Sequence, residues 1–176
     1  MAKKYVFTGG PNAGKTALID FLAAEGFDTL EESAMQIIKE EVKKGGTCVP
    51  WIDAKAFQDE VFKRQYNFEQ SLKHDRVVFL DRSFLDSMAF CKAKGINPCD
   101  DLLHALKKTD YYGVFLLELV PIENNNPLRK EDRVASEEVH NLLHDLYKDL
   151  GYDIIVVPFM PINERAEFVK DKIREL

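Results

Sequence analysis

Five short runs of apolar and β-favouring residues are spaced along the chain. They lie at 4–8, 27–30, 77–81, 112–117 and 153–157. Several of these runs are apolar at nearly every position rather than at alternate ones. Continuous runs of this length are typical of strands that are buried on both faces, as in a parallel sheet. The pattern therefore predicts five strands.

The segments between these runs place apolar residues at helical spacing. We expect helices at about 16–26, 33–44, 53–72, 84–94, 98–107, 136–150 and 161–176. Because strands and helices alternate throughout, the pattern predicts a single α/β domain over residues 1–176 with a mostly parallel sheet. Ligands of such sheets bind at the carboxyl ends of the strands. The chemistry should then lie just after residues 8, 30, 81, 117 and 157.

Composition narrows the class of protein. The chain has 176 residues, 45% of them hydrophobic and 31% charged, with a net charge of −6. An acidic chain argues against sequence-independent binding to nucleic acid, which needs a basic face. No apolar run approaches the roughly 20 residues of a membrane span, and the first residues do not form a signal peptide. We therefore expect a cytoplasmic protein with no nucleic-acid or membrane partner.

A glycine-rich motif follows the first predicted strand. Residues 9–16 read Gly-Gly-Pro-Asn-Ala-Gly-Lys-Thr, which fits G-x-x-x-x-G-K-[ST]. Such a loop points backbone N–H groups at phosphate oxygens, its lysine reaches the β- and γ-phosphates, and its hydroxyl can ligate Mg²⁺. We predict that Lys15 acts on the transferring phosphate and Thr16 on the metal. The predicted nucleotide contacts are Gly9, Gly10, Pro11, Asn12, Ala13, Gly14, Lys15, Thr16 and Ala17.

The third strand ends in Asp81-Arg82-Ser83. A carboxylate at this place can hold Mg²⁺, directly or through water, or it can accept a proton from a substrate hydroxyl. Arg82 would offer planar donors to a phosphate or to substrate oxygens. The simpler alternative is an aspartate that caps the next helix, with Arg82 in solvent. We favour the functional interpretation for Asp81 and Arg82.

Two further candidates follow the second and fourth strands. Glu31 and Glu32 end the second strand, where one of them could orient the acceptor as a base or help to hold the metal. The alternative is a pair of charges that favours the start of a helix, and the pattern does not decide between the two residues; we favour Glu32. Residues 120–135 form a long turn-rich and charged segment. Its Arg129 and Arg133 could close as a lid over the phosphoryl group, or lie in a solvated charge run.

Other residues carry weaker signals. Asp86 could reach the substrate or cap a helix. Trp51 could wall a pocket, although core packing is the more common place for a lone tryptophan. His140 and His144 are spaced like metal ligands but lack the glutamate of H-E-x-x-H. We interpret them as a solvated helix face and predict no zinc.

Taken together, the strand and phosphate loop at 6–16, the glutamates at 31–32, the Asp-Arg-Ser at 81–83 and the final strand and helix resemble one group of proteins. These are small AAA-type ATPases related to the kinase domain of the bacterial NAD-biosynthesis regulator. More broadly, the chain resembles the P-loop nucleoside and nucleotide kinases. The resemblance covers most of the chain. It implies a three-layer P-loop fold with a five-stranded sheet and helices on both faces, and ATP and Mg²⁺ as ligands.

The resemblance also implies roles for residues. Lys15 and Thr16 would bind phosphate and metal, Asp81 would be the strand-end carboxylate, and Arg82 would contact substrate or phosphate. Arg129 and Arg133 would be lid arginines.

Two functions fit these observations. The first is a kinase that moves the γ-phosphoryl group of ATP to a small acceptor, a nucleoside or a nucleotide. The second is a nucleotide-switched binding protein, or a slow ATPase or GTPase, without such an acceptor. A guanine-reading N-K-x-D motif is absent from the sequence. The acceptor and the oligomeric state are left open.

Overall fold

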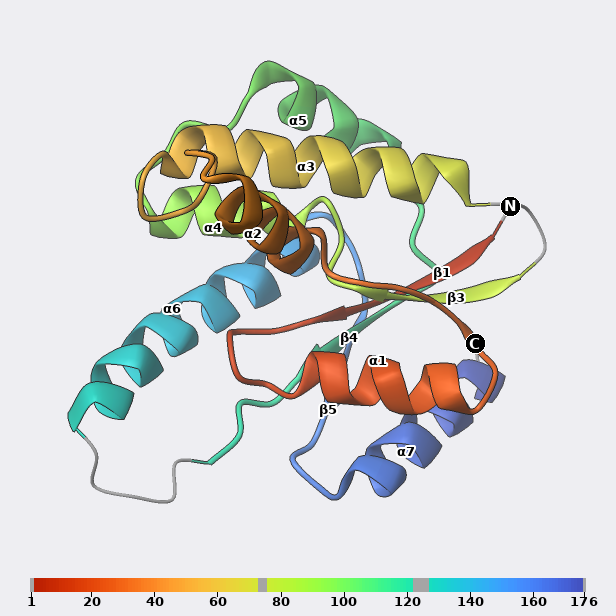
Figure 1. The fold of residues 1–176 in the computed structure, drawn as a ribbon. Coiled ribbons are helices and arrows are strands. Elements are labelled where there is room, and N and C mark those ends of the chain that lie inside the picture. Colours follow the sequence, from red (N-terminus) through yellow and green to blue (C-terminus); the bar gives the residue numbers. More distant parts are fainter. Residues whose placement is uncertain (1, 73–75, 122–126, 176) are drawn as a thin grey trace.

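The computed structural model describes residues 2–72, 76–121 and 127–175, apart from the side chains of 108 and 127–132. Within these residues five strands occur: β1 (Lys3–Thr8), β2 (Asp28–Leu30), β3 (Val77–Asp81), β4 (Gly113–Leu117) and β5 (Ile154–Val157). They form one sheet in the order β2-β3-β1-β4-β5, and all neighbours are parallel (Figure 1). The predicted strands and the parallel α/β architecture are confirmed.

The central strands are buried on both faces because their alternate residues point into two separate cores. Val6 and Leu80 belong to one buried cluster, and Phe7 and Phe79 belong to the other. The rings of Phe7 and Phe79 stack with their centroids 5.2 Å apart. This double burial is the physical reason for the continuous apolar runs in the sequence.

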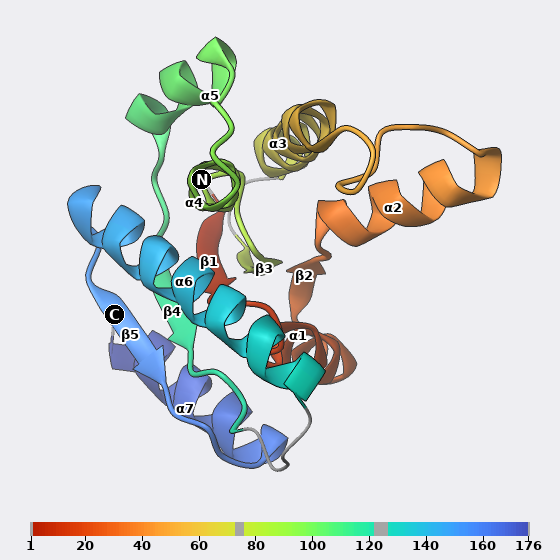
Figure 2. The same cartoon turned by 90° about the vertical axis from the view of Figure 1, so that its left-hand side faces the viewer.

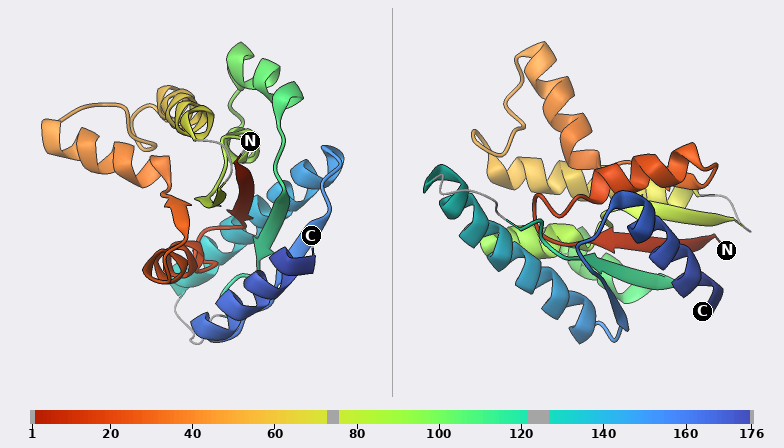
Figure 3. Two further views of the ribbon diagram at one scale, coloured as in Figure 1. Left: turned by 90° about the vertical axis from the view of Figure 1, so that its right-hand side faces the viewer. Right: turned by 90° about the horizontal axis from the view of Figure 1, so that it is seen from below.

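Helices cover both faces of the sheet, which gives three layers (Figure 1, Figure 2). One face carries α1 (Lys15–Ala24) and α7 (Ile162–Glu175), which contribute to the Phe7 core. The other face carries α3 (Ala54–Ser71), α4 (Asp86–Ala93) and α6 (Pro127–Asp149), with α5 (Asp100–Ala105) and a 3₁₀ turn (Leu106–Lys108) beyond them. Helix α2 (Ser33–Lys44) packs on α3 and extends outward from the edge of the molecule (Figure 3, left).

Helix α6 begins earlier than the sequence predicts. We expect its start near Ser136, after a charged loop, but the helix begins at Pro127. Proline suits the first position of a helix because its missing N–H is not needed there. The charged residues that follow it are good helix formers. The second half of the predicted lid segment is therefore helical, while residues 122–126 lie outside the described part of the chain.

The loops that follow β1 and β3 lie at the same edge of the sheet, opposite the two chain termini (Figure 1, Figure 3, right). A parallel sheet places all its carboxyl ends at one edge, so residues far apart in the sequence meet there. Among the described residues, no helix combines the length and apolar character that crossing a membrane requires.

Candidate functional site

The turn between β1 and α1 has the backbone of a phosphate-binding loop. Gly9 (φ 132°) and Gly14 (φ 78°) adopt dihedrals that favour glycine. A Cβ on Gly9 would lie 2.8 Å from the carbonyl oxygen of Leu117, and a Cβ on Gly10 would collide with the carbonyl oxygen of Ser136. The loop is therefore pressed against β4 and α6, and helix α1 begins at its end with Lys15.

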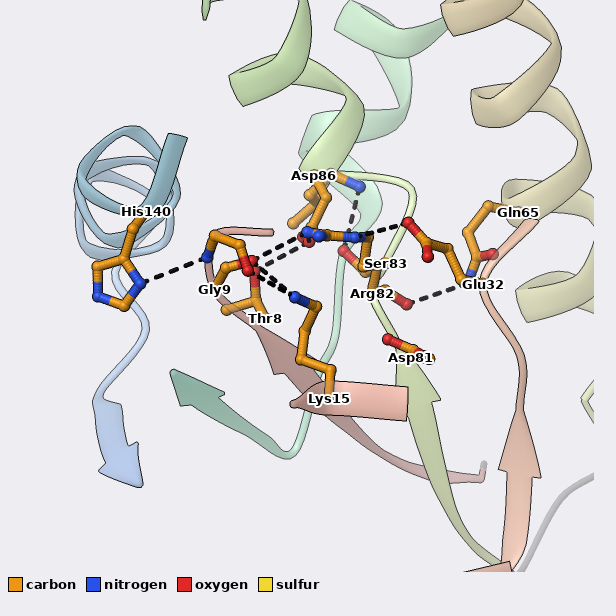
Figure 4. Close-up of polar contacts among 12 residues, drawn as sticks. Thr8, Gly9, Lys15, Glu32, Gln65, Asp81, Arg82, Ser83, Asp86 and His140 are labelled. Carbon is orange, nitrogen blue, oxygen red and sulfur yellow. Dashed lines mark hydrogen bonds and ion pairs between the residues drawn. The ribbon is translucent and has the colours of Figure 1, made fainter. Parts of the chain in front are cut away.

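Lys15 lies inside this loop. Its Nζ donates hydrogen bonds to the carbonyl oxygens of Gly9 (3.0 Å) and Gly10 (2.9 Å), and the residue is 6% exposed (Figure 4). Burial, followed by the neighbouring charge of Arg82, lowers the pKa of Lys15 to about 7. An anion in the loop would favour the charged form, because an opposite charge raises the pKa of an amine. The lysine is thus held where a phosphate would restore its charge.

Thr16 and Asp81 meet although they are 65 positions apart in the sequence. The Thr16 hydroxyl donates to Oδ2 of Asp81 at 2.8 Å. The other carboxylate oxygen, Oδ1, is buried with no hydrogen-bond partner, and burial together with the nearby Glu32 raises the pKa of Asp81. A hydroxyl and a carboxylate with a free oxygen are the hard donors that Mg²⁺ takes alongside nucleotide phosphates. Among the described residues, no group of three or more His, Cys, Asp or Glu side chains could hold a metal ion without ligands from nucleotide phosphates.

Arg82 is held from several sides. Its backbone adopts φ 68°, which is uncommon for a residue with a side chain. Its Nε donates to Glu32 (2.8 Å), and Nη1 donates to the carbonyl oxygen of Gly9 (3.1 Å) and to Asp86 (3.3 Å) (Figure 4). The guanidinium also lies 4.9 Å from the ring centroid of Phe90. Arg82 therefore joins the phosphate loop to the opposite wall of the site.

The structure separates the two adjacent glutamates. Glu32 contacts Arg82 and lines the cavity described below, as the sequence argument favours. Glu31 is exposed and accepts a hydrogen bond from Gln36 at 3.2 Å. The chemical role of Glu32 remains a prediction, but its place beside Arg82 is now defined.

Asp86 makes contacts that the sequence does not reveal. It is 2% exposed and accepts hydrogen bonds from Thr8 Oγ1 (2.9 Å) and from Tyr147 Oη (2.7 Å), in addition to Arg82. Burial raises the pKa of Asp86. Its carboxylate therefore connects the end of β1, helix α6 and the arginine, and neither of the two roles expected from the sequence, helix capping or direct substrate contact, describes these contacts.

Two further side chains, Tyr147 and Gln65, form hydrogen bonds with the loop that follows β3. Tyr147 is fully buried, and its hydroxyl shares a 2.6 Å hydrogen bond with Ser83. Gln65 of α3 donates to the carbonyl oxygen of Arg82 at 3.1 Å and accepts from Ser33 at 2.6 Å. No local motif marks Tyr147 or Gln65, because both look like ordinary members of amphipathic helices.

The phosphate loop has partners that sequence reasoning missed. The Gly10 N–H donates to Nδ1 of His140 at 3.4 Å, and burial followed by the charge of Lys15 lowers the pKa of His140. The prediction of a solvated face is therefore wrong for this histidine. Arg165 of α7 is 3% exposed and donates to the carbonyl oxygen of Ala13 at 2.9 Å. Its Nε and Nη2 are buried without a partner.

The remaining candidates lie away from this cluster. Arg133 donates to Glu137 (2.6 Å) and to the carbonyl oxygen of Val120 (2.8 Å), and it does not line the cavity. The side chain of Arg129 lies outside the described residues. Trp51 is 65% exposed, so the expectation of core packing is wrong for it.

A cavity of about 570 Å³ extends from the phosphate loop into the space between α2, α3 and α4. Glu32, Arg82 and Asp86 lie along it, between the loop and a largely apolar chamber. The larger apolar and aromatic side chains of the chamber are Met35, Ile38, Pro50, Phe57, Val61 and Phe90. The amide of Gln58 also lines it, and its Oε1 is buried with no hydrogen-bond partner.

Comparison with known proteins places this geometry in a class. A family model described as an AAA domain matches residues 4–165, so the chain belongs to that family of P-loop proteins. No curated protein matches the chain. Among solved structures, thymidylate kinase from Ehrlichia chaffeensis superposes with a TM-score of 0.68 at 16% identity, covering 98% of both chains.

Two other solved structures share the fold. Deoxyadenosine kinase from M. mycoides has a TM-score of 0.65 at 12% identity, covering 98% of this chain and 100% of that one. Shikimate kinase from Acinetobacter baumannii has a TM-score of 0.58 at 18% identity, covering 99% and 94%. The chain is thus a P-loop protein with the fold of small-molecule kinases, which confirms the family resemblance drawn from the sequence.

Proposed function

We propose that this protein is a kinase that transfers the γ-phosphoryl group of ATP, with Mg²⁺, to a small acceptor, a nucleoside or a nucleotide. The observation that carries the proposal is the continuity of one cavity. The phosphate loop lines one end of this cavity, and apolar side chains line the chamber at its other end. Glu32 and Arg82 lie between the two ends. A donor phosphate and an acceptor would therefore meet next to these two side chains, and such positioning supplies most of the catalysis in phosphoryl transfer.

Different residues around the phosphate loop would bind the phosphates and the metal at the donor end of the cavity, where ATP would lie. Lys15 and the loop amides would hold the transferring phosphate, and Arg129 and Arg133 would add charge if the segment before and within early α6 closes as a lid. Thr16 and Asp81 would hold Mg²⁺, since the unpaired Oδ1 of Asp81 and the Thr16 hydroxyl are suitable donors. The metal would neutralise charge on the phosphates.

The chamber supports a nucleoside-sized acceptor. Phe57 and Phe90 offer ring surfaces of the kind on which a flat base packs. Gln58 brings a buried, unpaired amide oxygen, which a base could satisfy with an N–H donor. The fold relatives named above are kinases of thymidylate, deoxyadenosine and shikimate, and the M. mycoides structure holds dCMP and dCDP as products. The second hypothesis from the sequence, a nucleotide-switched binding protein, has no need of such a chamber.

The proposal is tested by incubating the purified protein with ATP and Mg²⁺ and a panel of acceptors. The panel contains ribo- and deoxynucleosides, their monophosphates and shikimate, and the products are identified by mass spectrometry. We expect a phosphorylated product from one chemical class, and its loss in the Asp81→Asn variant. Binding of ATP without product from any acceptor would contradict the proposal. Because ATP would be the phosphoryl donor, we propose that the reaction takes place in the cytoplasm.

A further inference from the structure

Two polar side chains that line the cavity have buried atoms with no hydrogen-bond partner among the described residues. These atoms are Oε1 of Gln58 in α3 and Oγ of Ser87 in α4, and Ser87 as a whole is 2% exposed. Gln65 and Asp86 line the same cavity, but each of them forms at least two hydrogen bonds within the protein. The unpaired atoms therefore distinguish Gln58 and Ser87 from the polar residues that hold the site together.

Both residues lie on helix faces that border the chamber. On α3, Phe57, Gln58 and Val61 all line it, at a spacing that places them on one side of a helix. On α4, Ser87 and Phe90 line it at the same helical spacing. The two unpaired atoms thus belong to walls that also present the rings of Phe57 and Phe90.

A ligand could supply the missing partners. A buried polar atom without a partner costs folding free energy, because water no longer hydrates it. Oε1 of Gln58 accepts a hydrogen bond and requires an N–H or O–H donor, whereas the hydroxyl of Ser87 can both donate and accept. A flat ring that packs against the phenylalanines and carries a donor beside an acceptor on its edge would satisfy both atoms. Nucleobases have edges of this kind.

We infer that Gln58 and Ser87 select the acceptor by binding the edge of its base. Gln58 Oε1 accepts a hydrogen bond from a base N–H, and the Ser87 hydroxyl donates to a ring nitrogen or carbonyl oxygen of the same base. The inference rests on the proposed kinase function and adds the residues that determine its specificity. A site built for hydrogen bonds rejects an analogue that lacks them, so a base without N–H groups on this edge is a poor acceptor.

The first experiment removes the hydrogen bond of Gln58 from either side. The acceptor found with the panel described above is compared with an analogue in which methyl groups replace the base N–H hydrogens, such as 3-methyluridine or adenosine with a dimethylated amino group. We expect the analogue to lower kcat/KM of the wild type by about 100-fold. Gln58→Leu should lower kcat/KM for the parent acceptor by a similar factor and leave that for the analogue nearly unchanged. Gln70→Leu, at an exposed glutamine of the same helix, should keep the full discrimination.

Three outcomes would contradict the inference. If Gln58→Leu discriminates as well as the wild type, the methyl groups are excluded by their size, and the kinase proposal stands without this inference. If shikimate is phosphorylated and no nucleoside or nucleotide is, the phosphoryl transfer stands and the base-binding role of Gln58 and Ser87 is wrong. If ATP binds and no acceptor in the panel yields a product, the proposed function fails and this inference fails with it.

The second experiment separates a binding role of Ser87 from a structural one. Ser87→Ala removes an atom that is unpaired in the ligand-free protein, so the thermal midpoint should stay level or rise. The KM for the acceptor should rise at least about tenfold while the KM for ATP stays unchanged. Ser71→Ala is the control, because the Ser71 hydroxyl is exposed and donates to the carbonyl oxygen of Phe68 at 2.7 Å; it should change neither KM. A Ser87→Ala protein with an unchanged KM for the acceptor would overturn the assignment of Ser87.

Discussion

The two ends of the cavity, which we propose to be a donor end at the phosphate loop and an acceptor end at the apolar chamber, are built in different ways. The donor end is largely one continuous segment, in which strand β1, the glycine loop and helix α1 follow each other between residues 3 and 24. The acceptor end is assembled from α2, α3, α4 and the loop after β3, and α6 holds it through Tyr147. The contact of Tyr147 with Asp86 joins residues 61 positions apart. A continuous segment can be recognised as a motif, whereas an assembled wall becomes visible only in the folded protein.

The difference also concerns stability. At the donor end, Lys15 is buried among backbone carbonyls, so its charge costs folding free energy, and we propose that this charge serves ligand binding. At the acceptor end, buried polar groups hold one another and the loop that carries Arg82. Substitutions should therefore separate function from stability at the donor end and change both together at the acceptor end.

The largest expected effect comes from Lys15→Met. The variant keeps the side-chain volume but loses the charge at the transferring phosphate, and we expect kcat to fall by about 10³-fold. The thermal midpoint of the ligand-free protein should stay level or rise, because a buried ammonium no longer has to be desolvated. Steady-state kinetics and a thermal melt measure the two quantities.

Lys172→Met is the matched control for this prediction. Lys172 is paired with Glu175 on the surface of α7, so its loss should leave kcat unchanged. A Lys15→Met protein that unfolds at a clearly lower temperature would show that both ends are built alike, against the comparison drawn above.

The second prediction concerns Glu69, a buried carboxyl of α3. It accepts hydrogen bonds from the Phe84 N–H (2.9 Å) and the Tyr111 hydroxyl (2.7 Å), yet burial raises its pKa to about 7. Between pH 4.5 and 7 the folded protein holds a proton that the unfolded chain has released. The free energy of unfolding should therefore fall as the pH rises through this window, with a contribution of about 3 kcal/mol from Glu69.

Urea denaturation at a series of pH values tests this contribution. Glu69→Gln stays neutral and should reduce the dependence on pH by that amount. Glu60→Gln, which changes a partly exposed glutamate of the same helix paired with Arg64, should not. If the curves of wild type and Glu69→Gln run parallel between pH 4.5 and 7, the buried carboxyl does not titrate in this range and the prediction is wrong.

The smallest effect is expected for Tyr147→Phe. The change removes one hydroxyl and leaves the buried carboxylate of Asp86 and the Ser83 hydroxyl each short of a partner. We expect a loss of about 2 kcal/mol in unfolding free energy. The turnover of the acceptor should also fall, because Asp86 contacts Arg82. The affinity for ATP should stay the same, because Asp86 does not contact the described amides of the phosphate loop.

Tyr152→Phe provides the comparison for this variant. The Tyr152 ring lies 5.9 Å from that of Tyr147, and its hydroxyl accepts one longer hydrogen bond, 3.4 Å from the Tyr111 N–H. It should change stability less and acceptor turnover not at all. Equal effects of the two variants on turnover would mean that the contact with Asp86 does not position Arg82.

The sequence was sufficient to predict the strands, the parallel sheet and the position of the phosphate loop between β1 and α1. It also led to the expectation that the candidate residues gather at one edge of the sheet, because parallel strands bring their carboxyl ends together there. At that edge the structure pairs Thr16 with Asp81 and Glu32 with Arg82. It could not reveal Gln65 or Tyr147. Their side chains reach the site only through the packing of α3 and α6 on the sheet, and this packing has no signature at the residues themselves.

Two of the wrong predictions, the start of α6 and the place of His140, have a common cause. The start of α6 was placed too late because a charged stretch was interpreted as a loop, although charged residues form helices well. His140 was assigned to a solvated helix face because the glutamate of H-E-x-x-H is missing, but α6 lies against the phosphate loop and this histidine accepts a hydrogen bond from Gly10. In both cases the local sequence pattern does not show which element of the fold packs against the segment.

The exposed position of Trp51 has a practical consequence. It is the single tryptophan of the chain, and it lies between Pro50 and Ala54, which both border the chamber. Tryptophan fluorescence therefore originates from one place, in the connection from α2 to α3. Emission spectra and quenching by iodide would follow that connection during a titration, so the protein carries its own optical reporter without a label.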